Sequence, residues 1–253
     1  MKKFKLFFVV VLLGILSFKQ VSDVDKLNAI IAKYETEREY DFDTSESVEN
    51  TIKYYQAEAD FSKELKVELE SVSAEGLSKT DQISRELLLF VLQDKMDENT
   101  YKMYLNTITN ESAFHLNLSR MGNRTIENEK QAKDYLKRLD NLPKRIDYNL
   151  NLLRAAMKEG FAQPRAVFNN YEDTYNKHIV SDPTESEFYK PFHKLPESFS
   201  DELKDSIINV AKASVQKNTI DQYKIIKSFF EDEYFPNTRK GLGISTVPNG
   251  KEF

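Results

Sequence analysis

The scarcity of turn-forming residues constrains the fold of this chain more than any other feature of its sequence. Only 7 glycines and 7 prolines occur among 253 residues, well below the usual share in globular proteins. All-β sandwiches and propellers need frequent turns, so this composition disfavours them. The length is sufficient for one large helical domain, or two small ones, with a proper hydrophobic core.

Apolar residues recur at helical spacing through most of residues 24–234. This pattern predicts an all-α fold, a multi-helix array or bundle, in which residues 23–253 form a single helical region. The individual helices are expected at about 24–37, 47–70, 80–105, 128–141, 143–160, 164–179, 200–215 and 219–234.

The helix expected at 80–105 has two further features. Thr80 is a candidate N-cap residue. The run 87–92 is apolar at every position, which predicts a helix buried on all sides in the middle of a bundle.

Three segments interrupt the helical pattern. Residues 106–127 are predicted to form a long surface loop, and residues 181–196, which contain three prolines, an extended connector. The tail after Tyr234 is predicted to be extended and rich in turns, because Pro248-Asn249-Gly250 is a strong turn signal.

The N-terminus has the anatomy of an export signal. Three lysines within the first five residues precede the 11-residue run Leu6–Leu16, which is apolar apart from Gly14. That run is too short to cross the hydrocarbon core as a helix. Residues 1–22 are therefore predicted to be a signal peptide or a short N-terminal anchor. The rest of the chain, residues 23–253, is expected in the periplasm, in the cell envelope or outside the cell, with membrane contact only through residues 1–22.

Charge and composition exclude several functions. Without residues 1–22, the chain has 32 basic and 41 acidic residues. A net charge of −9 argues against a nucleic-acid partner, because such binding depends on basic residues that neutralise phosphates. Cysteine is absent, which excludes disulfides, a thiolate nucleophile and Cys-ligated metals.

No residue pattern points to catalysis or to a cofactor bound by this chain. The three histidines, His115, His178 and His193, are 63 and 15 residues apart, whereas helical zinc hydrolases place two histidines one turn apart. Nucleophile elbows, phosphate loops and EF-hand loops are missing from the sequence as well. The Tyr and Phe residues at helical spacing are interpreted as core rather than as a ligand cage.

Several segments of residues 80–253, in their order and spacing, resemble the N-terminal half of the DUF885 family. These are bacterial, often exported or lipid-anchored proteins grouped with zinc metallopeptidases of the gluzincin type. The segments are 135–143, 160–165, 188–192, 220–223 and, most densely, Tyr234-Phe-Pro-Asn-Thr-Arg239-Lys-Gly-Leu-Gly-Ile-Ser-Thr-Val-Pro248-Asn249-Gly250.

This resemblance implies a role in peptide cleavage, but not a complete enzyme. Family members are considerably longer, and their zinc motif, His-Glu followed by Pro-Gly-His, lies in a C-terminal half that has no counterpart here. The chain is therefore expected to be a truncated or split member that forms cleft wall and substrate contacts, is inactive alone, and has the zinc-bearing half as its partner. The alternative is a free-standing periplasmic helical module for binding or scaffolding.

Arg239 is the first candidate for a substrate-binding residue, with Tyr234 and Asn249 behind it. Arg239 follows the last predicted helix where the resemblance is densest, and a guanidinium can hold a peptide carboxylate through two parallel hydrogen bonds. Alternatively, Arg239 bonds the free carbonyl groups at the end of that helix. The family pattern further implies that the face around Phe229, Phe230 and Tyr234 packs against the missing half.

Overall fold

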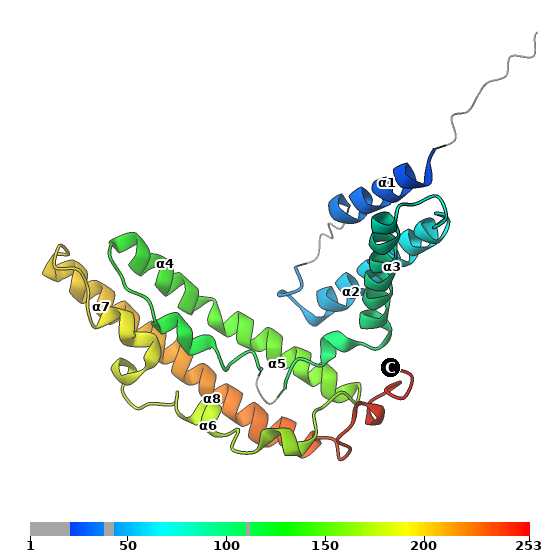
Figure 1. Ribbon diagram of the computed structural model, residues 1–253. Helices are drawn as coiled ribbons and strands as arrows, with labels where there is room; N and C mark the ends of the chain where they lie inside the picture. The colour runs from blue at the N-terminus through cyan, green and yellow to red at the C-terminus, as the bar shows by residue number, and fades with distance from the viewer. Residues whose placement is uncertain (1–20, 38–42, 110–111) are drawn as a thin grey trace, which may run out of the picture.

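The chain folds into helices arranged in two lobes (Figure 1). A computed structural model describes residues 21–37, 43–109 and 112–253, so the predicted export segment lies outside it except for Val21 and Ser22. Within these ranges no strand forms, apart from one isolated bridge between Pro164 and Arg239. The predicted all-α array is confirmed. None of the described helices is both long and apolar enough to span a membrane.

The first lobe consists of α1 (Asp23–Thr36), α2 (Val48–Glu70) and α3 (Lys79–Thr100), at the upper right of Figure 1. Helices α2 and α3 pack along their length as a hairpin, and α1 contacts both of them. The lobe has its own core, made of Leu27, Ile30, Leu65, Leu69, Val72, Leu77, Leu88 and Leu92.

Serine caps begin all three helices of this lobe. The side chains of Ser22, Ser47 and Ser78 each accept a hydrogen bond from the backbone N–H three residues later. The prediction of Thr80 as the cap of the third helix is wrong. Ser78 has the extended backbone that an N-cap requires, so α3 begins before Thr80.

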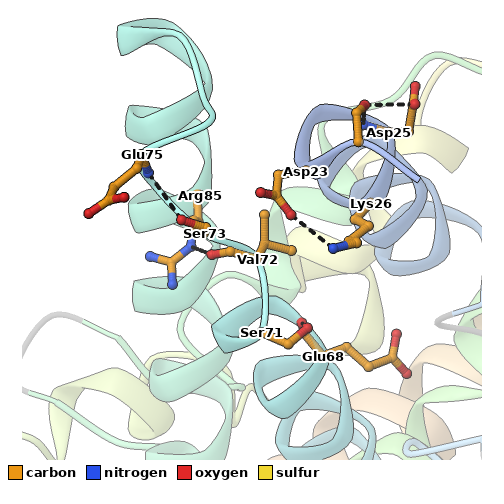
Figure 2. Close-up of polar contacts among 10 residues, drawn as sticks. Asp23, Asp25, Lys26, Glu68, Ser71, Val72, Ser73, Glu75 and Arg85 are labelled. Carbon is orange, nitrogen blue, oxygen red and sulfur yellow. Dashed lines mark hydrogen bonds and ion pairs between the residues drawn. The ribbon is translucent and has the colours of Figure 1, made fainter. Parts of the chain in front are cut away.

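The turn between α2 and α3 is held by side chains of α3 and of the turn itself (Figure 2). Arg85 Nε of α3 donates to the carbonyl oxygen of Val72 at 3.1 Å. Val72 itself is buried, so its carbonyl would otherwise lack a partner. Next to the turn, Lys26 Nζ and Asp23 Oδ1 of α1 form an ion pair at 2.9 Å.

The prediction that residues 87–92 are buried on all sides is wrong. Leu88 and Leu92 face α2 and are buried, whereas the side chains of Ile83, Leu87 and Phe90 are 61%, 61% and 70% exposed. These three residues lie on one face of the helix, and we call them the α3 stripe. The hairpin covers only one side of α3, and no other described helix covers the stripe.

The second lobe contains α4 (Glu129–Asp140), α5 (Leu142–Lys158), α7 (Asp201–Val215) and α8 (Asp221–Ser228), at the lower left of Figure 1. It holds the largest hydrophobic cluster of the described chain. Helix α5 ends where expected. Gly160 has φ +82°, and the N–H groups of Gly160 and Phe161 bond back to the carbonyls of Met157 and Ala156, which is a Schellman cap.

Helices α7 and α8 form one continuous rod rather than the two separate helices predicted. Two π-helical segments, Gln216–Ile220 and Phe229–Tyr234, complete it. The first π segment replaces the expected break, because Asn218 turns inward there and its Nδ2 donates to Asp140 Oδ1 at 2.7 Å.

The aromatic end of the rod is buried within the chain itself. Phe229, Phe230 and Tyr234 are at most 1% exposed. They pack in a cluster of rings with Phe168 and Tyr171. The expectation that this face is left open for a missing half is therefore wrong.

The remaining segments are more compact than predicted. The described residues of the segment 106–127, which are 106–109 and 112–127, form no α-helix, as expected, but they bury Ile108 and His115 and so are not simply a surface loop. Residues 181–196 form 3₁₀ turns at Pro183–Glu185 and Glu187–Phe192 instead of an extended connector.

The helix predicted at 164–179 is broken. It is reduced to a 3₁₀ turn at Arg165–Phe168 and the single-turn α6 (Asp173–Asn176). Asn170 between them has φ +57°, a conformation that ends a helix and that Asn tolerates better than most residues.

A small hydrophobic cluster joins the two lobes. It consists of Leu105 from the 3₁₀ turn Met103–Leu105, Leu152 and Ala156 from α5, and Phe161. Val48 of α2 and Val247 of the tail pack against it. The C-terminal half of α5 therefore links the first lobe, the second lobe and the tail.

Neighbouring leucines of α3 should respond differently to truncation. We expect Leu88→Ala to lower the free energy of unfolding by about 2–5 kcal/mol, because it leaves a cavity in the first-lobe core. Leu87→Ala should change it by no more than about 0.5 kcal/mol, because the side chain is exposed. Denaturant unfolding of both variants measures the difference, and equal losses would show that the α3 stripe is covered.

Two histidines are buried among the aromatic rings. His115 and His178 are 0% and 4% exposed. His115 Nε2 lies 3.0 Å from Thr174 Oγ1, while His115 Nδ1 and His178 Nε2 have no hydrogen-bond partner among the described residues. Burial, reinforced by the charge of Lys177, lowers the pKa of His115 to about 3 and that of His178 to about 4. Both imidazoles are therefore neutral in the folded protein near pH 7.

This burial should make the protein acid-sensitive below pH 6.5. The folded pKa values lie below the unfolded one, so the stabilisation is complete above pH 6.5 and declines as the pH falls toward 4. Each histidine should contribute about 1.4 kcal/mol per pH unit to the slope of unfolding free energy. His178→Phe keeps a ring that cannot be charged, so it should remove roughly half of this slope between pH 6 and 4.5. Urea unfolding at several pH values tests this, and an unchanged slope would contradict it.

Candidate functional site

Two of the three predicted site residues, Tyr234 and Arg239, form hydrogen bonds with the backbone of the same residue, Gln163. Tyr234 lies at the end of the rod, and its hydroxyl accepts a hydrogen bond from the N–H of Gln163 at 3.0 Å. The N–H of Arg239 donates to the carbonyl oxygen of the same Gln163 at 3.2 Å. Gln163 itself was not predicted as a site residue, although it lies within one of the segments that resemble the family.

The guanidinium of Arg239 organises the segment that follows it. Its Nη1 donates to the carbonyl oxygens of Gly241 and Gly243 at 2.9 and 2.7 Å, and also to the hydroxyl of Thr246. The carbonyls that Arg239 binds thus belong to the tail, and not to the end of the preceding helix. There, Asn237 Nδ2 donates to the carbonyl of Glu233 instead.

A small cavity of about 80 Å³ lies beside Arg239. Asn106, Gln163 and Arg239 provide its polar lining, and Gln163 Nε2 donates to Asn106 Oδ1. Arg239 Nε is buried and has no hydrogen-bond partner among the described residues. A polar cavity of this size has room for a few waters or one small polar group.

Asn249 occupies the last turn of the tail. It adopts φ +58°, and Gly250 follows where a Cβ atom would stand 1.9 Å from the carbonyl oxygen of Ile244. The turn returns the chain to the lobe junction, where the hydroxyl of Tyr101 donates to the carbonyl of Glu252 at 3.2 Å. Asn249 therefore shapes the tail at some distance along the chain from Arg239, and its role in binding stays a prediction.

A second, larger hollow opens between α2 and α5. It measures about 420 Å³ and is lined by Thr44, Thr51, Tyr54, Tyr55, Tyr104, Thr107, Tyr148 and Leu152. The rings of Tyr55 and Tyr104 stack at 4.6 Å between centroids. Burial raises the pKa of both phenols, so they remain neutral hydroxyl groups. We call this hollow the tyrosine cavity.

Sequence reasoning missed the tyrosine cavity because it assigned the tyrosines to the core. Tyr55, Tyr104 and Tyr148 are only half-buried. The adjacent pair Tyr54-Tyr55 is the signal in the sequence, because the side chains of neighbouring helix residues point about 100° apart and so cannot both point at the centre of one core.

The described residues contain no cluster of side chains suited to a metal ion. Within residues 21–37, 43–109 and 112–253, no group of three or more His, Asp or Glu side chains is placed to hold a metal ion.

Arg239→Gln should loosen the tail without unfolding the lobes. The substitution removes charge-assisted hydrogen bonds to two carbonyls, each worth about 1.5–3 kcal/mol. We expect cleavage by lysyl endopeptidase after Lys240 to accelerate at least about tenfold, since 1.4 kcal/mol corresponds to a factor of ten. The exposed Arg120 provides the control variant Arg120→Gln. Equal cleavage rates in the two variants would show that Arg239 does not hold the tail.

Comparison with solved structures finds a similar fold in a longer protein. A crystal structure described as "the putative lipoprotein from Colwellia psychrerythraea" matches 92% of this chain with a TM-score of 0.60 and 15% sequence identity. The match covers 42% of that chain, so the present chain spans less than half of its length. At this identity the likeness shows the fold alone.

Comparison with protein families is more specific. None of the curated proteins compared matches the chain. The family model described as "Bacterial protein of unknown function (DUF885)" matches residues 38–253, which is most of the sequence and includes α2 and α3 of the first lobe, the second lobe and the tail. The chain therefore belongs to the DUF885 family.

Proposed function

We propose that this chain is the exported N-terminal helical portion of a metallopeptidase-like protein. In this proposal it forms one wall of the substrate cleft and contacts a peptide-like substrate, and it does not catalyse cleavage alone. The observation that carries the proposal is the tyrosine cavity, an open hollow with aromatic and hydroxyl lining at the junction of the two lobes. Ligand sites commonly combine apolar lining with a few polar groups in this way.

The comparisons support the larger context of the proposal. The solved neighbour is more than twice as long as the matched region, so a further portion can supply the groups that this chain lacks. The resemblance assigns a zinc ion, held by a His-Glu and Pro-Gly-His motif, to that further portion, which would be the partner of this chain. The neighbour's description as a lipoprotein supports export, to the periplasm, the cell envelope or the medium.

This proposal assigns a role to each of the predicted site residues Arg239, Tyr234 and Asn249. Arg239 Nη1 forms hydrogen bonds with the tail, so the other two nitrogens of the guanidinium are available to a ligand in the small cavity. Tyr234 is buried, so it acts by positioning Gln163 and not by touching the substrate. Asn249 maintains the turn that closes the tail.

A specific observation favours the alternative, a free-standing module for binding or scaffolding. The α3 stripe exposes three large apolar residues on one helix face, as helices that dock on partners do. A neighbouring reading frame that encodes the zinc motif would favour the split enzyme, and its absence would favour the module.

The isolated chain should bind short peptides without cleaving them. Because the protein has no tryptophan, the fluorescence of a peptide tryptophan reports binding directly. We expect the emission to shift to shorter wavelength as the indole enters the tyrosine cavity, and mass spectrometry should detect only intact peptide with or without one equivalent of zinc. Metal-dependent cleavage would refute the proposed division of labour, and the absence of any peptide binding would refute the substrate-contact role.

A further inference from the structure

We propose that a groove along α5 binds the carboxyl-terminal end of a short apolar peptide. In this inference the tyrosine cavity receives an apolar side chain, and Arg145 with Lys144 holds the terminal carboxylate. The choice of a peptide rests on the proposed function, whereas the polarity of the site, apolar at one end and cationic at the other, rests on the residues described below.

The groove is formed by two hollows that meet at Tyr148. The tyrosine cavity uses Tyr148 and Leu152 of α5. A second hollow of about 460 Å³ is lined by Ser45, Asn141, Lys144, Arg145, Tyr148 and Asn149. Positions 141, 145, 148 and 152 follow the three-to-four spacing of one helix face, so the two hollows lie end to end along α5.

The apolar end of the groove is open and uncharged. Tyr54 and Tyr55 come from α2, Tyr104 from the segment after α3, and Tyr148 from α5. The hydroxyl of Tyr148 lies 2.8 Å from Thr51 Oγ1, which fixes the ring at the centre of the groove. Tyrosine side chains provide large apolar contact area at low cost in conformational entropy and keep a hydroxyl for a peptide group.

The other end of the groove carries two available cations. Lys144 and Arg145 lie in the first turn of α5 and are exposed. Among the described residues, neither side chain forms a hydrogen bond or an ion pair, although Lys144 acts electrostatically on Asp43. Arginine is well suited to hold a carboxylate through two parallel hydrogen bonds.

The charges around this end favour a single carboxylate over a polyanion. Asp43 lies within electrostatic reach of Lys144, and Glu46 and Asp147 line an adjoining hollow together with Lys144. These three acids repel a ligand with several negative charges, such as a nucleic acid, but Arg145 stays available to bind one carboxylate. The net negative charge of residues 23–253 also disfavours a polyanionic ligand.

The length of the groove sets the size of the ligand. Arg145 and Leu152 are seven residues apart on a helix, which corresponds to about 10 Å at 1.5 Å per residue. An extended peptide advances about 3.3 Å per residue, so about three residues fit between the two ends. A tripeptide with an apolar first side chain and a free carboxylate therefore matches both ends.

The test uses the peptide pair Ac-Trp-Ala-Ala-OH and Ac-Trp-Ala-Ala-NH₂ with the full chain. Fluorescence titration should show that the free acid binds about tenfold more tightly than the amide, as expected for one charge-assisted interaction. The double variant Lys144→Gln/Arg145→Gln should remove this preference and leave amide binding unchanged. Lys158→Gln, an exposed lysine in the last turn of the same helix, is the matched control and should keep the preference.

A second variant tests the tyrosine cavity. Thr44→Phe places a ring in the cavity and should weaken binding of both peptides at least about tenfold, whereas Thr80→Phe at an exposed position of α3 should not. Circular dichroism melting of each variant verifies that it is folded. If the acid and the amide bind equally, the groove inference fails and the proposed function stands. If Thr44→Phe has no effect while peptides still bind, the tyrosine cavity is not the binding site, and the observation that carries the proposed function fails together with the groove inference. If the chain cleaves the peptides, or binds neither of them, the proposed function fails as well.

Discussion

The burial of Leu105 and Phe161 against α5 is the interaction on which the arrangement of this molecule depends. Both side chains are less than 7% exposed and contact the face of α5 that carries Leu152 and Ala156. Fully burying such a side chain contributes about 1.5–3 kcal/mol. The contact fixes where the first lobe stands relative to α5, and therefore whether the tyrosines of α2 and Tyr148 face one cavity. The same contact fixes the position of Phe161, with which the segment 161–164 begins. Tyr234 and Arg239 both form hydrogen bonds with the backbone of Gln163 in this segment.

Helices with a partner on one face and solvent on the other could be predicted from the sequence. α2 and α5 begin and end within one or two residues of the expected positions, because a serine cap, a first-turn proline and a C-terminal glycine act locally. The exposure of Leu87 and Phe90 could not be predicted. Hydrophobicity indicates which residues can be buried, but the number of neighbouring helices decides which of them are.

The candidate site was predicted in part for the same reason. Arg239 follows a helix and begins a glycine-bounded segment, which indicates a residue that shapes its surroundings, and it does organise that segment. Its meeting with Tyr234 at Gln163 joins residues 71 positions apart or more, which a single sequence does not reveal. The tyrosine cavity depends on three elements distant in the chain, and each of its tyrosines taken alone is consistent with a core position.

The π-helical segments show how tertiary packing overrides local preference. Phe229 and Tyr234 are five residues apart, so a regular α-helix, with about 100° per residue, would place their side chains about 140° apart around its axis. A π segment at Phe229–Tyr234 has a wider turn, and within it Phe229, Phe230 and Tyr234 are all buried in one aromatic cluster. The local cost of a poorer backbone geometry is offset by the burial of three large rings. The same wide turn places the hydroxyl of Tyr234 at the N–H of Gln163, so the packing of the core and the geometry of the candidate site have one cause.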